Sequence, residues 1–157
     1  MSPVMASFCV LIASCQTPNF KTPNAEAPTP NVKVTLVVIL ASETGDTIDA
    51  KLTAIAKEVR MKYPSLTNFA LKSMSCESLP VDKKTLMPVV DNKDVAITIK
   101  HSADQEKRVS LAVVPPDQGE IVYRSVCDKF LPIVTRYHTA ANERLILAIR
   151  VQPCKGE

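Results

Sequence analysis

The sequence predicts an α+β domain: one buried strand, one amphipathic helix and then an antiparallel β-meander, folded as a curled sheet or a sandwich. Three observations predict it. An apolar run over 32–41 is rich in β-branched residues and lacks Gly and Pro, which is typical of a strand buried on both faces. A helical stripe of apolar residues follows it. Alternating, strand-like segments fill the rest of the chain.

The helix is predicted over 47–63. Its N-cap is expected at Asp46 or Thr47, and it should stop before Pro64, because a proline disfavours helical geometry in the residue before it. The predicted apolar face, which should pack on the sheet, consists of Ile48, Leu52, Ile55, Ala56, Val59 and Tyr63.

The remaining strands follow from alternation and turn residues. Pro88 marks one of them as an edge strand, and the segments around Ile97 and Leu111 alternate in the manner of a hairpin with one face inward. The predicted strands are 69–76, 85–90, 95–99, 109–113, 121–127, 131–137 and 144–151.

Composition excludes several functions. The 157 residues carry a net charge of +3 with interspersed signs and no Trp, so we expect no nucleic-acid partner. The glycines Gly45, Gly119 and Gly156 are isolated, which excludes the common nucleotide-binding loops. No spacing of Cys or His is typical of a metal site, and no cofactor is expected.

The first residues predict export. Residues 1–14 contain a short apolar core of signal-peptide length, and it ends in Ile12-Ala13-Ser14-Cys15. This tetrapeptide resembles the lipobox of bacterial lipoproteins. The resemblance implies a signal peptide over 1–14, lipidation of Cys15 and a membrane as partner. An ordinary cleaved signal and an unprocessed cytoplasmic chain are the alternatives.

A proline-rich polar segment over 15–31 has the composition of an extended tether. It leads into a single domain over 32–154, and this order is similar to that of lipid-anchored envelope proteins that face the periplasm or exterior. The folded part resembles, in its strand–helix–meander layout, small exported bacterial domains of unknown function.

Cysteine positions allow one disulfide in an oxidising compartment. If a loop over 139–142 closes a hairpin that pairs Tyr137 with Arg144, the same register places Cys127 opposite Cys154. A bond between them would stabilise the fold by roughly 3–4 kcal/mol in the chain-entropy model. A different pairing that includes Cys76, or three free thiols, are the alternatives.

The best position for a small ligand is the loop after the first strand, with Ser42, Thr44 and Gly45. Ligands gather where a strand ends and a helix begins, although Glu43 and Asp46 would repel phosphate. A plain capped turn is the alternative.

No catalytic residues are predicted. His101 and His138 are expected in loops or at the surface, and an enzyme that uses Cys76 or Cys127 with a histidine has no local sequence signature. The sequence therefore favours a non-catalytic interaction or structural module of the cell envelope, with a partner protein that it does not identify. A small-ligand or protein-binding domain in the cytoplasm and an enzyme of unrecognised class are the alternatives.

Overall fold

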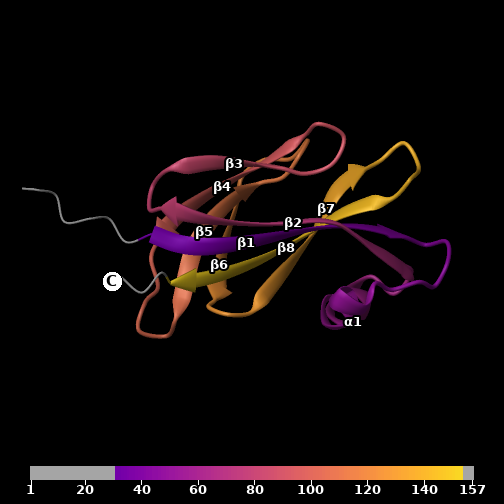
Figure 1. Cartoon of the computed structure of the whole chain (residues 1–157), viewed down its shortest axis with the longest axis horizontal. Helices are drawn as coiled ribbons and strands as arrows, with labels where there is room; N and C mark the ends of the chain where they lie inside the picture. The colour runs from indigo at the N-terminus through magenta and orange to yellow at the C-terminus, as the bar shows by residue number, and fades with distance from the viewer. Residues whose placement is uncertain (1–30, 154–157) are drawn as a thin grey trace, which may run out of the picture.

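Two antiparallel sheets of four strands each face one another in the computed structural model, which describes residues 31–153 (Figure 1). The first sheet has the order β2-β1-β8-β7 and the second has the order β3-β4-β5-β6. The strands are β1 (Asn31–Ser42), β2 (Asn68–Pro80), β3 (Lys84–Pro88), β4 (Asp94–His101), β5 (Arg108–Val114), β6 (Ile121–Val126), β7 (Phe130–His138) and β8 (Arg144–Pro153), and the helices are the 3₁₀ turn η1 (Ala50–Leu52) and α1 (Thr53–Lys62).

The predicted α+β class is wrong. In the described residues the α-helix is limited to the 10 residues of α1, whereas strands build both main layers. The segments predicted as one meander divide between two sheets, because the chain changes sheet after β2 and again after β6. Each sheet therefore covers one face of the other, and the helix covers only part of the remaining face of the first sheet.

Strand β1 organises the core, and its predicted burial on both faces is confirmed. Val34, Leu36 and Val38 point between the two sheets and pack with residues of β4, β5 and β8. Val37 and Ile39 point the other way and pack against α1. Because successive side chains of a strand alternate between its faces, one strand contributes to both clusters.

The helix begins later than the sequence predicts. Ile48 forms a parallel bridge with Phe69 of β2, and the N–H of Phe69 donates to the carbonyl of Thr47 at 2.9 Å. The backbone at 47–49 is therefore paired with β2 and cannot start a helix. Asp49 provides the cap instead, since its Oδ1 accepts from the N–H of Lys51 at 3.0 Å.

Two aspartates mark the points where the chain changes sheet. Asp82 follows β2 and Asp128 follows β6, and both adopt positive φ, at 63° and 66°. The N–H of Asp82 donates to the carbonyl of Ile99 at 2.8 Å, and that of Asp128 to the carbonyl of Val151 at 2.9 Å. Each corner thus connects the two sheets through a backbone hydrogen bond.

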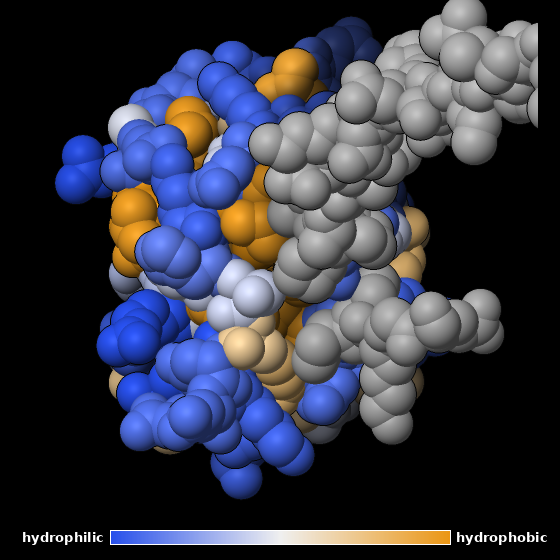
Figure 2. Space-filling model, turned by 90° about the vertical axis from the view of Figure 1, so that its left-hand side faces the viewer, coloured by the Kyte–Doolittle hydropathy of each residue, from blue (hydrophilic) through white to orange (hydrophobic). Residues whose placement is uncertain are grey.

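Most remaining strands lie where alternation predicts them. The pairing of β4 with β5 confirms the predicted hairpin, and β3, which contains Pro88, is an edge strand as expected. At one end of the molecule, hydrophilic residues cover most of the surface and hydrophobic ones show as separate patches (Figure 2).

Candidate functional site

Polar groups of the predicted ligand loop at Ser42, Thr44 and Gly45 already form hydrogen bonds within the protein. Ser42 Oγ donates to the carbonyl of Thr44 at 2.9 Å and accepts from Asn68 Nδ2 at 3.3 Å. Thr67 Oγ1 donates to the carbonyl of Gly45. The helix, moreover, starts at residue 50 and is capped by Asp49, so its N–H groups do not face this loop.

A small recess of about 130 Å³ lies beside Ser42, next to His138 and Arg144. Of the three predicted residues it includes Ser42 but neither Thr44 nor Gly45. The guanidinium of Arg144 is already engaged, because its Nε donates to the carbonyl of Thr135 at 2.8 Å and its charge stacks over the Tyr63 ring. The small-ligand assignment to Ser42, Thr44 and Gly45 stays a prediction.

The predicted Cys127–Cys154 bond and the lipidation of Cys15 involve residues outside the described part of the chain. The register that motivated the disulfide is wrong, because β8 pairs Arg144 with His138 rather than with Tyr137. Cys127 is buried and Cys76 is exposed, and neither forms a disulfide with another residue of 31–153. Burial raises the pKa of the Cys127 thiol, with lesser contributions from Asp128 and Asp104.

No recess of the described residues combines a histidine with one of these thiols. His101 and His138 are exposed, and the recesses that they line contain no cysteine. Within residues 31–153, no three His, Cys, Asp or Glu side chains are grouped so that they could hold a metal ion. No helix in this range is long and apolar enough to span a membrane.

The strongest candidate site is the outer side of β6. The core contains Val109, Leu111 and Val113 of the neighbouring β5, so the residues between them face outward. The pairing of Ala112 with Val122 and of Ser110 with Arg124 places both β6 residues on the same outer face. Val122, Arg124 and Val126 therefore form a row along the edge of the second sheet, and we call it the β6 row.

The β6 row is apolar at both ends and cationic in the middle. Val122 is 57% exposed and Val126 is 40% exposed. Between them, the side chain of Arg124 is 68% exposed, and its Nη2 reaches Asp104 Oδ2 only at 3.5 Å. Such an exposed and long ion pair contributes little stability, so the guanidinium is available to another carboxylate.

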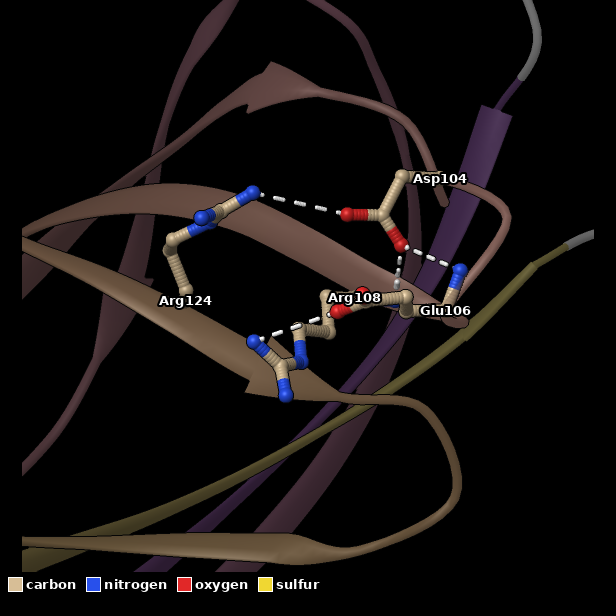
Figure 3. Close-up of polar contacts among 4 residues, drawn as sticks. All are labelled: Asp104, Glu106, Arg108 and Arg124. Carbon is tan, nitrogen blue, oxygen red and sulfur yellow. Dashed lines mark hydrogen bonds and ion pairs between the residues drawn. The ribbon is translucent and has the colours of Figure 1, made fainter.

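Figure 3 shows what surrounds this arginine. Asp104 is fixed by its other carboxylate oxygen, which accepts from the N–H groups of Glu106 and Arg108, both at 2.9 Å. Arg108 in turn pairs with Glu106 at 3.3 Å. Asp104 and Glu106 lie in the loop between β4 and β5, Arg108 begins β5, and Arg124 extends towards them from β6.

The other open edges carry features that hinder strand pairing. In β2 a bulge interrupts the register beside Lys72, β3 is only 5 residues long and ends at Pro88, and β7 contains Pro132. Bulges, lysines and prolines protect natural edges from pairing with other chains. β6 has six residues, no proline and a continuous register with β5.

Sequence reasoning missed the β6 row. The segment was predicted as a strand, but the alternation of its side chains does not show whether a strand has one neighbour or two. β6 is an edge strand because it pairs with β5 alone. A run of Val122, Arg124 and Val126 at two-residue spacing was the one available signal.

Comparison with protein-family models, with curated proteins and with solved structures finds no match. The fold and the β6 row are therefore interpreted from their own geometry.

Proposed function

We propose that this protein is a non-catalytic interaction module of the cell envelope that binds an extended segment of a partner protein along β6. The observation that carries the proposal is an edge strand without a bulge or a proline, in which an exposed arginine lies between two exposed valines. An extended segment can add a strand to such an edge: main-chain hydrogen bonds supply affinity and alternate side chains supply specificity.

The row specifies the partner's chemistry. Residues directly opposite on one face of a strand pair are neighbours. A segment that pairs with β6 therefore places an acidic residue against Arg124 and apolar residues against Val122 and Val126. The expected recognition pattern is apolar–x–acidic–x–apolar, and its symmetry allows either strand direction.

The position of the chain ends agrees with a tethered module. Val32 at the start of β1 pairs with Pro153 at the end of β8, so both ends of the described domain lie side by side. In the proposal, lipid on Cys15 and the proline-rich segment over 15–31 hold the domain from this end.

Titration with a short peptide tests the binding site. The probe is an acetylated and amidated peptide with the core Val-Thr-Glu-Thr-Val, and its control has Lys in place of Glu. Backbone amide shifts should concentrate on β6 and β5. Because like charges opposite one another are unfavourable, the Lys peptide should bind about fivefold or more weakly.

Two variants serve as a matched pair for this titration. Val122→Lys should abolish binding, whereas Leu86→Lys, at an equally exposed apolar site on the edge strand β3, should leave it unchanged. Equal binding of both peptides, or equal loss in both variants, would overturn the assignment to β6.

The anchor is tested separately. Bacteria that express the full chain are grown with an alkynyl fatty acid, and labelling of the wild type is compared with that of Cys15→Ala. Labelling that disappears in the variant supports the lipid anchor. Equal labelling of the two proteins, or none in either, contradicts it and leaves the peptide test unaffected.

A further inference from the structure

A cleft of about 250 Å³ lies between α1 and the open edge of β7, and Tyr123 of β6 also lines it. Four consecutive residues, 131–134, line it, so the cleft crosses the edge of the strand from one face to the other. Leu131 and Ile133 pack in the core between the sheets, and Val134 packs in the second core, between α1 and the first sheet. The floor is therefore apolar and continuous with both cores.

The rim of the cleft is polar. Tyr63 follows the C-terminus of α1 and Tyr123 comes from the inner face of β6, and both line the cleft. Neither phenol hydroxyl makes a hydrogen bond to another residue within 31–153. Burial, assisted by Tyr63, raises the pKa of Tyr123, so this phenol stays protonated near neutral pH and remains a hydrogen-bond donor.

The charged residues that line the cleft are Lys62 and Glu58, one helical turn apart on α1. Lys62 is therefore the cation that an anion in the cleft can face, next to two hydroxyl donors. Arg144 does not line the cleft, although its guanidinium lies 5.0 Å from the centre of the Tyr63 ring.

We propose that this cleft binds a small carboxylate with an apolar or aromatic body. The body lies on Val59, Leu131 and Pro132, and the carboxylate accepts hydrogen bonds from the two phenols and faces Lys62. The volume is just below the range of about 300–1,000 Å³ typical of drug-sized ligands, so the ligand is small. The site uses the side chain of Tyr123 on the inner face of β6, whereas the proposed peptide pairs with the main chain of β6 and contacts its outer face.

The probe is 4-phenylbutyrate, and its uncharged analogue 4-phenylbutanamide is the control. Both are titrated into the isotope-labelled protein while amide and methyl resonances are recorded. The carboxylate should shift signals of 58–63, 123 and 131–134, and it should bind about tenfold more tightly than the amide, because only the carboxylate gains from Lys62.

Three variants refine the test. Lys62→Gln should remove the preference for the carboxylate, and Tyr123→Phe should weaken carboxylate binding without unfolding the protein. Lys57→Gln, an exposed position that does not line this cleft, is the matched control and should bind as the wild type does. Circular dichroism verifies that each variant is folded.

The proposal is overturned if 4-phenylbutyrate shifts no signal of 131–134 up to its solubility limit. It is equally overturned if the amide binds as tightly as the acid, or if Lys57→Gln and Lys62→Gln weaken binding alike. None of these results changes the expectation for peptide binding at β6.

Discussion

Thr135 is a polar side chain with no exposed surface, and it bridges an irregularity between β7 and β8. The register of these strands shifts between Val134 and His138. There Thr135 Oγ1 donates to the carbonyl of Leu145 at 2.8 Å and accepts from the N–H of Tyr137 at 3.2 Å. One hydroxyl thus replaces ladder bonds that the bulge interrupts.

Thr135→Val keeps the shape of this side chain but removes both hydrogen bonds. We expect the free energy of unfolding to fall by about 1–3 kcal/mol, because a buried carbonyl and a partly buried N–H each lose their partner. Urea denaturation measures it. Thr98→Val, at a partly exposed position on the outer face of β4, should change stability far less, and an equal effect of both would refute the role of Thr135.

Tyr137 links the loop after β3 to β7. Its hydroxyl donates to Asp91 Oδ2, Lys93 lies over its ring, and Lys93 also pairs with Asp117 at 3.1 Å. The hydrogen bond to Asp91, followed by burial and the charges of Asp91 and Asp117, raises the pKa of Tyr137 from 10.0 to about 12.

This shift predicts a pH dependence at the alkaline end. The folded state favours the neutral phenol, so its contribution is fully present below pH 10 and is lost as the pH rises towards 12. The difference in unfolding free energy between wild type and Tyr137→Phe should therefore be largest near neutral pH and shrink between pH 10 and 12. Denaturation at several pH values measures it, and a constant difference would contradict the assignment.

Among the elements, η1 and α1 depend on packing rather than on their own propensity, since isolated helices of this length are marginal. Leu52 is 1% exposed and packs with Ile39, Val59 and Phe69. Leu52→Ala should cost about 2–5 kcal/mol of unfolding free energy, whereas Lys57→Ala on the exposed face should stay within about 0.5 kcal/mol. Denaturant unfolding measures both losses. A loss below 1 kcal/mol for Leu52→Ala would mean that the packing of the helix on the first sheet contributes little to the free energy of unfolding.

The corner at Asp82, where the chain changes sheet, requires a backbone conformation with positive φ. Its φ of 63° is accessible to Gly but costs a β-branched residue about 1–2 kcal/mol. Asp82→Val should therefore be less stable than Asp82→Gly by about this amount, as measured by thermal unfolding. Equal stability would show that the corner relaxes.

Single elements were largely predictable from the sequence, and their partners were not. The run over 32–41 predicted a strand buried on both faces because its side chains show no polar period. The start of the helix was wrong because the bridge between Ile48 and Phe69 is a contact that local periodicity does not encode. Similarly, the Tyr137–Arg144 register failed because the bulge beside Thr135 shifts the pairing. The edge position of β6 follows only from the order of strands in the second sheet.

At the scale of the whole molecule, the chain changes sheet twice and forms two open sheets. Two open sheets have four edge strands. Three of them carry a bulge, a proline or a short length that hinders pairing, and β6 does not. Figure 1 shows α1 at one end of the molecule, and the ends of the described domain meet at the start of β1 and the end of β8. Asp128, which follows β6, is hydrogen-bonded to Val151 of β8, so the C-terminal end of the proposed binding edge lies beside the ends of the domain.

Amide hydrogen exchange with and without the Val-Thr-Glu-Thr-Val peptide measures whether a strand adds to β6. We expect exchange to slow at outward-facing amides of 121–126 when peptide is present, because a new strand accepts their hydrogen bonds. Exchange at 84–88 of β3 should not change. Unchanged exchange throughout β6 at saturating peptide, or protection that appears at β3 instead, would contradict the claim that β6 is the binding edge.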